Sequence, residues 1–188
     1  FSYPAEVHPV FDKPRVSFHN YGQPAGAKLN LAGDLGLVFN TSYVELRAKG
    51  YVHVIGAGPF QVQMPKTWGA HVSRLTKYLL EGHGDAQIDR QVSLDRESID
   101  RVITWIDINA PYYPDYAGGA FRDHPYGRSP ISTPELNRLG ELGGVNLADR
   151  KTYRRLIDQV NFTRPAQSPC LAGLTDPEEK RNAITSTF

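Results

Sequence analysis

Residues 15–22, with the sequence RVSFHNYG, hold the feature from which the fold and the function of this chain are best argued. A histidine, His19, stands here directly before a stretch rich in glycine and turn-forming residues. Two residues separate Arg15 from Phe18, and His19 follows Phe18 at once. This spacing makes His19 the first candidate for a ligand-binding side chain.

The motif C-x-x-C-H attaches a c-type haem, and residues 15–19 have its spacing and its histidine. Arg15 and Phe18 occupy the two cysteine positions, so this segment is unable to form the two thioethers that would hold the porphyrin covalently. His19 nevertheless keeps an imidazole. Because b-type sites hold haem through axial ligands and apolar contacts alone, the loss of both thiols does not by itself remove haem binding.

The composition predicts one domain, or one domain with an appended subdomain. With 188 residues the chain is long enough to bury a substantial core. Its 21 basic and 20 acidic side chains nearly cancel, which argues against nucleic acid or a charged membrane surface as a partner. No apolar run approaches the roughly 18 residues that cross a bilayer, so we expect no membrane span. The single cysteine, Cys170, has no partner for an internal disulfide, and we expect it to be a buried filler.

Short helices joined by long loops dominate the predicted secondary structure, and the predicted fold class is mainly α. The strongest helical pattern lies within residues 93–111, where Ser93 or Asp95 is placed to cap the start. A second pattern, within residues 70–82, ends at Gly82, where a left-handed cap is expected. Further helices are predicted over residues 3–12, 42–50, 133–145 and 149–160, a short strand over 51–55, and loop or irregular structure over 22–40 and 112–130.

Three separated segments resemble one known family. They are YPAEVHPVFDKPRVSFHNYGQPAGAKLNL (residues 3–31), WGAHVSRLTKYLLEGHGD (68–85) and RVITWIDINAPYYPDY (101–116). In this order they are similar to the cytochrome c-like domain of proteins related to the hydrazine synthase alpha subunit, which are abundant in planctomycetes. The resemblance implies a cytochrome c-like domain over residues 1–116. An aromatic and proline-rich connector with a helical extension, residues 117–188, would pack on it.

The resemblance also implies roles for single residues. His19 corresponds to the proximal iron ligand, and His83, in EGHGD, has the place of the distal ligand, so that haem, if bound, would have bis-histidine ligation. Trp105 would pack the helix around it against the N-terminal helix or against the porphyrin edge. Proteins of this family are large and extracytoplasmic, which implies a periplasmic or secreted location, with other domains, subunits or redox partners as neighbours. The hydrazine synthase reaction needs further haem and metal groups and partner subunits, so it is not carried over.

Three functional hypotheses follow for the candidate residues. Phe18 is large enough to fill part of the space left by a thioether, and Arg15 places a charge beside it. Both favour a haem-free domain with a structural or interaction role in a larger protein. The first alternative is a non-covalent haem protein that transfers electrons through His19 and His83. The second is a non-haem metal site in which His71 joins these two histidines.

Other candidate residues have simpler interpretations. No nucleophile elbow, phosphate loop or zinc-protease motif is present, so a non-enzymatic role is preferred. Met64 is expected to be a packing residue, and Asp100 and Asp107 to lie on a solvated helix face. The aromatic cluster of residues 112–126 is expected to clamp the extension onto the core, or alternatively to form a contact surface for protein or carbohydrate.

Overall fold

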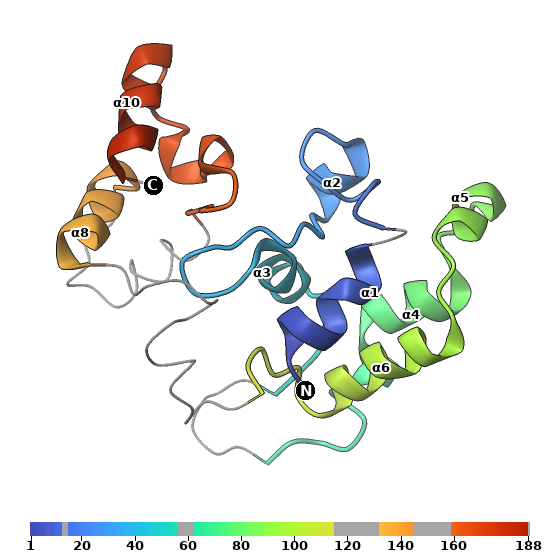
Figure 1. Cartoon of the computed structure of the whole chain (residues 1–188). Coiled ribbons are helices and arrows are strands. Elements are labelled where there is room, and N and C mark those ends of the chain that lie inside the picture. Colours follow the sequence, from blue (N-terminus) through green and yellow to red (C-terminus); the bar gives the residue numbers. More distant parts are fainter. Residues whose placement is uncertain (13–14, 56–61, 115–131, 145–158, 188) are drawn as a thin grey trace. The chain divides into compact units, whose positions relative to one another are not determined.

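The computed structural model describes residues 1–12, 15–55, 62–114, 132–144 and 159–187, and these form a mainly helical, loop-rich fold (Figure 1). The chain divides into two compact units. The first comprises residues 1–33 and 42–114, and the second comprises residues 34–41 and 115–188. Among the helices so described, none has both the length and the apolar sequence that a bilayer crossing requires.

The first unit begins with a helix that changes its hydrogen-bond pattern at a proline. The wide turn η1 (Tyr3–Val7) runs directly into α1 (His8–Asp12). Pro9 has no backbone N–H, so the ordinary helical bond to the carbonyl four residues earlier is missing there. The N–H of His8 instead donates to the carbonyl of Tyr3, five residues back. The helix predicted over residues 3–12 thus continues through Pro9, with a wider turn before it.

The remaining helices of the first unit are short and closed by recognisable caps. Asp95 accepts a hydrogen bond from the N–H of Ser98 and caps α6, as the sequence predicted for one of two candidate residues. Gly82 ends α4 with a φ of 81°, where positive φ was expected. The helices of this unit after α1 are α2 (Pro24–Lys28), α3 (Thr41–Ala48), η2 (Ala70–Val72), α4 (Arg74–Glu81), α5 (Ala86–Gln91) and α6 (Arg96–Asp107).

A cluster of buried aromatic rings holds the N-terminal helix against α6. Tyr3 and Trp105 are both fully buried, and their ring centroids lie 4.9 Å apart. Tyr43 of α3 meets the Tyr3 ring edge-on at 5.1 Å and the Tyr112 ring edge-on at 4.8 Å. Such edge-to-face pairs add about 0.5–1.5 kcal/mol each beyond the area that they bury. The rings of η1, α3 and α6 and of the segment after α6 therefore meet in one aromatic core.

The polar atoms of this core are paired. The Tyr3 hydroxyl donates to the Ser42 hydroxyl oxygen at 2.9 Å, and the indole N–H of Trp105 donates to the Pro111 carbonyl at 2.9 Å. Burial raises the pKa of Tyr3 far above its usual range, so this hydroxyl remains a donor. Of the two positions that the resemblance allowed for Trp105, the structure shows contact with the N-terminal helix.

The second unit is anchored by a buried carboxylate. Asp34, 5 % exposed in its side chain, accepts two hydrogen bonds from the Arg164 guanidinium, at 2.7 and 2.6 Å. The Asn161 amide donates to the same carboxylate at 2.6 Å, and the Leu35 N–H donates to the Thr163 hydroxyl at 2.9 Å. This network joins residues 34–41 to a segment more than a hundred residues later in the chain.

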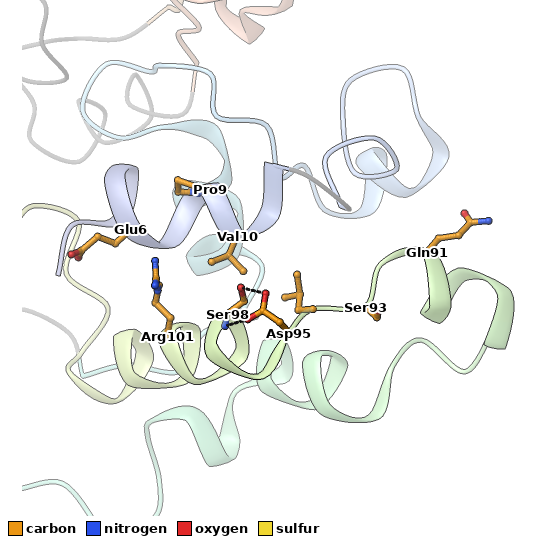
Figure 2. A pocket seen from close by; sticks show the side chains of 9 residues that line it. Glu6, Pro9, Val10, Gln91, Ser93, Asp95, Ser98 and Arg101 are labelled. Atoms are coloured by element: carbon orange, nitrogen blue, oxygen red, sulfur yellow. Dashed lines mark hydrogen bonds between the residues drawn. The ribbon is translucent and has the colours of Figure 1, made fainter.

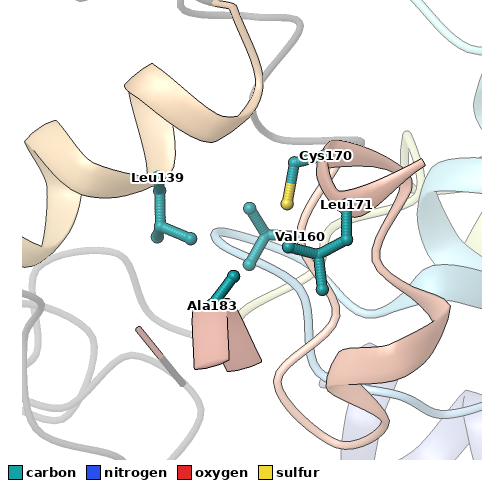
Figure 3. Packing of buried hydrophobic residues seen from close by; sticks show 5 residues of the cluster. All are labelled: Leu139, Val160, Cys170, Leu171 and Ala183. Atoms are coloured by element: carbon teal, nitrogen blue, oxygen red, sulfur yellow. The ribbon is translucent and has the colours of Figure 1, made fainter. Parts of the chain in front are cut away.

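A small hydrophobic core completes the second unit (Figure 3). Leu139 lies on α8 (Thr133–Leu142), which begins with a capping box made by Ser132 and Glu135. Cys170 is buried in this core as a free thiol, whose pKa is raised by burial. The core residues are Leu139, Val160, Cys170, Leu171 and Ala183, contributed by α8, η5 (Pro169–Leu171), α10 (Pro177–Thr187) and the chain before η4 (Pro165–Gln167).

Several segments differ from the sequence-based expectations. The strand predicted for residues 51–55 is wrong. The N–H groups of Tyr51 and Val52 both donate to the Leu46 carbonyl at the end of α3, so they are not available to pair with another strand. The single turn α2 lies within the stretch expected to be loop, and α5 was not predicted. The predicted helices over 42–50, 93–111 and 133–145 correspond to α3, α6 and α8. The predicted helix 149–160 and most of the aromatic cluster 112–126 lie outside the described residues.

The Asp34 network gives a testable prediction for stability. Asp34→Ala leaves a partly buried guanidinium and the Asn161 amide without their acceptor. It should lower the free energy of unfolding by about 2 kcal/mol, since Arg164 is partly solvated. Urea denaturation measures this change. Asp34→Asn keeps an oxygen acceptor of the same shape and should lose less; equal stability of the native protein and Asp34→Ala would contradict the assigned role.

Candidate functional site

A tight turn after α1 positions Arg15 and His19. The N–H of Arg15 donates to the Phe11 carbonyl at 3.1 Å. The Arg15 carbonyl then accepts the N–H of Phe18 at 3.1 Å and that of His19 at 2.8 Å. Arg15 and His19 are therefore one turn apart. Arg15 is buried, while Phe18 and His19 are partly buried.

The loop around α2 holds the His19 ring from one side. Nδ1 of His19 lies 2.9 Å from the Leu29 carbonyl oxygen, and the N–H of Leu31 donates to the His19 carbonyl at 2.8 Å. Because a carbonyl only accepts, Nδ1 carries the proton, and the lone pair of the neutral ring is on Nε2. The loop returns this closely because residue 26 is glycine: a Cβ there would lie 1.8 Å from the Asn20 carbonyl oxygen. Burial lowers the pKa of His19 and favours this neutral form.

A second glycine-flanked loop, between α4 and α5, presents His83. Asp89 of α5 accepts the backbone N–H of His83 at 2.7 Å, and its Oδ1 lies 3.0 Å from Nδ1 of the same residue. The first of these bonds contributes most to lowering the pKa of Asp89. A carboxylate also only accepts, so His83, like His19, is protonated on Nδ1 and has its lone pair on Nε2. Gly82 and Gly84, with φ of 81° and 82°, wrap this loop around the carboxylate.

The two histidines are neighbours in the folded chain. The ring centroids of His19 and His83 lie 6.3 Å apart, with 34° between the planes. Tyr78 of α4 stacks on His83 at 5.5 Å, with 25° between the planes. An imidazole nitrogen lies about 2 Å from a bound metal ion, so two imidazoles on opposite sides of one ion have centroids about 6 Å apart. The structure thus brings together the two residues that the resemblance pairs, at a separation compatible with shared coordination.

Arg15 is the unusual residue beside this pair. It is 5 % exposed, and its Nε is buried without a hydrogen-bond partner in the part of the chain described. Burial lowers the pKa of Arg15, whereas the charge of Asp89 raises it. The charge of Arg15 in turn contributes to lowering the pKa of His19. The guanidinium is therefore within electrostatic range of His19 and of the carboxylate that holds His83.

His71 does not join the two histidines. It is exposed on η2, and within residues 1–12, 15–55, 62–114, 132–144 and 159–187 no three His, Cys, Asp or Glu side chains form a group suited to a metal ion. Trp105 lies in the aromatic core described above. Met64 is 72 % exposed, so packing, its expected role, is limited to a surface contact.

Two carboxylates on α6, those of Asp100 and Asp107, accept hydrogen bonds that the sequence did not predict. Asp107 accepts the N–H of Ala70 at 2.7 Å and thereby fixes the start of η2. Asp100 accepts from the Arg96 guanidinium at 2.9 Å on the exposed face of the helix. Both side chains are exposed, as expected, and Asp107 has a structural hydrogen bond in addition.

Two open surface grooves lie elsewhere and do not include either histidine of the pair. One runs between the N-terminal helix and α6 and is shown in Figure 2. Its polar side chains already have partners: Asp95 accepts from Ser98, and Arg101 donates to Glu97 at 2.6 Å. The other lies between α8 and α10 in the second unit. The candidate site therefore rests on the histidine pair and Arg15.

Comparison with known proteins assigns no family to this chain. No protein-family model matches the sequence, and neither curated proteins nor solved structures show a significant match.

The two glycines beside His83 supply a matched test of how this loop is held. Alanine at residue 82 would place its Cβ 2.5 Å from the Asp89 carboxylate, whereas alanine at residue 84 meets nothing within 4 Å. Both substitutions have to adopt a positive φ, at a cost of roughly 1–3 kcal/mol. We expect only Gly82→Ala to displace Asp89, and therefore to shift the NMR signals of the His83 ring strongly. Similar His83 spectra for both variants would argue against the Asp89 clamp.

Proposed function

We propose that the first unit binds haem without covalent attachment, with His19 and His83 as axial ligands, and serves electron transfer. The observation that carries this proposal is the His19–His83 pair, with ring centroids 6.3 Å apart and both lone pairs on Nε2. The resemblance to cytochrome c-like domains agrees with it, and Arg15 and Phe18 explain why the attachment is non-covalent. Apolar burial of a porphyrin, at about 25 cal/mol per Å², is large enough to compensate for two missing thioethers.

The residues around the two imidazoles have distinct tasks in this function. The Leu29 carbonyl fixes the His19 tautomer, and Tyr78 packs against one face of His83. Asp89 accepts from Nδ1 of His83 and thereby orients this ring. When bound, haem with two histidine ligands supplies one-electron transfer and leaves no open coordination position for a substrate.

The proposal also covers the location of this domain and its neighbours. A domain of this kind would pass electrons between other domains or subunits of a larger extracytoplasmic protein, in the periplasm or outside the cell, as the resemblance implies. The 21 basic and 20 acidic residues nearly cancel, so the chain has no strong overall electrostatic field. This fits a domain that recognises its redox partners by shape and local contacts.

A haem-free structural or interaction domain is the second candidate, and one observation favours it. Arg15, buried where the motif would have a thiol, and the partly buried Phe18 occupy space beside the histidine pair. If these side chains fill the site, His19 and His83 remain as a packed remnant of a haem module, and the role of the domain lies in its contacts within a larger protein.

Absorption spectroscopy separates these candidates. The whole chain, purified and titrated with haem, should show a sharp Soret band with low-spin α and β bands at one haem per chain. His19→Ala and His83→Ala should each weaken binding at least about tenfold, since each removes one axial ligand. His71→Ala, which changes an exposed histidine outside the pair, should bind as the native protein does.

Other outcomes of this titration are equally informative. A spectrum that shows only unbound haem would overturn the proposal and leave the structural role. Equal binding by His19→Ala and the native protein would place any bound haem elsewhere. Elemental analysis of the purified chain distinguishes haem iron from zinc or copper held by the two imidazoles.

A further inference from the structure

We propose that Arg15 binds a carboxylate of the molecule held by His19 and His83, and so replaces a covalent anchor by an electrostatic one. This inference rests on the proposed function and deepens it. It assigns to Arg15 a task opposite to the one that the sequence suggested, since a charge at this position was expected to disfavour the ligand.

The first argument is the state of the Arg15 side chain. It is 95 % buried, and its Nε–H meets no acceptor among the residues that the structure describes. An unpaired donor in a dry environment is costly, and a buried charge without a partner is more so. A ligand group that accepts from Nε would remove this cost.

The second argument is that the nearby carboxylate is already occupied. Asp89 is the acidic side chain whose charge acts on Arg15, yet no ion pair within 4 Å joins the two among the described residues. The Asp89 carboxylate instead accepts both the backbone N–H and the ring nitrogen of His83. Turning Asp89 toward Arg15 would release His83, so the guanidinium needs an acceptor from outside this network.

The third argument is the position of Arg15 relative to the histidine pair. Its carbonyl accepts the N–H of His19 at 2.8 Å, so the two side chains begin one turn apart. The charge of Arg15 also reaches the His19 ring. A molecule coordinated between His19 and His83 would therefore have one of its edges near the guanidinium.

The chemistry of the guanidinium selects the group that it binds. Its planar fork of N–H donors matches a carboxylate with two parallel hydrogen bonds, and the pairing is strongest where water is excluded. Haem carries two propionate carboxylates on an otherwise apolar rim. The inferred contact is thus between Arg15 and a haem propionate. The haem edge that carries the propionates would then lie where the edge bonded to the cysteines would lie in a covalently attached haem.

The test compares haem with haem dimethyl ester, in which both carboxylates are esterified. Each is titrated into the whole chain and followed by the Soret band, with the signal from His19→Ala subtracted as binding outside the pair. We expect the ester to bind about ten to a hundred times more weakly than haem, because one buried charged hydrogen-bond pair is lost.

Variants of Arg15 locate the effect. Arg15→Met should bind haem and the ester equally, at the affinity that the native protein has for the ester or somewhat above it. Arg15→Gln, a second neutral replacement, serves if the methionine variant does not fold, as judged by circular dichroism. Arg90→Met removes an exposed arginine next to Asp89 and should keep the full preference for haem.

The outcomes separate this inference from the function on which it rests. No Soret band with either compound would overturn both. Equal affinity of the native protein for haem and its ester would overturn the Arg15 contact while the histidine ligation stands. A preference for haem that persists in Arg15→Met and Arg15→Gln would show that another residue binds the carboxylate.

Discussion

The packing of Tyr3 against Trp105 is the contact on which the described arrangement of the first unit depends. It holds the N-terminal helix on α6, and α6 in turn contacts α4. His19 follows the N-terminal helix by a short turn, and His83 follows α4 directly. Since both histidines are carried by elements that pack on α6, their separation is set by this aromatic core and by the two loops that hold the rings.

Hydrogen bonds at Nδ1 orient the imidazole rings of His19 and His83. Leu29 and Asp89 each accept from Nδ1, one through a neutral carbonyl and the other through a carboxylate. Both imidazoles therefore carry a proton on Nδ1 and are oriented by that hydrogen bond. Arg15 adds a positive charge nearby that is buried and incompletely paired. These three side chains, two imidazoles and one buried guanidinium, are the residues on which the proposed haem site rests.

Prediction from sequence worked best where the signal was local or periodic. The cap at Asp95, the positive φ of Gly82 and the helices around them are confirmed, because each depends on a few neighbouring residues. The ψ of Gly82, −167°, is not that of the left-handed cap expected there. The strand over 51–55 is wrong, because alternation cannot show that the backbone of Tyr51 and Val52 is used by the end of α3. The helix α5 was missed, although Asp85 before a run of helix-forming residues is a recognisable cap that would have revealed it.

The sequence by itself determined the helical class, the absence of thiols at residues 15 and 18, and the identity of the two candidate imidazoles. The first two depend on side-chain chemistry and short-range pattern, as does the choice of His19, whereas His83 was identified through the resemblance. Only the tertiary structure decided that the rings of His19 and His83 lie 6.3 Å apart, that Asp89 binds His83, and that Arg15 is buried. The first of these facts joins residues far apart in the chain, and the second joins two residues of one loop and the helix after it. All three are set by packing and hydrogen bonding, for which the sequence pattern carried no signal.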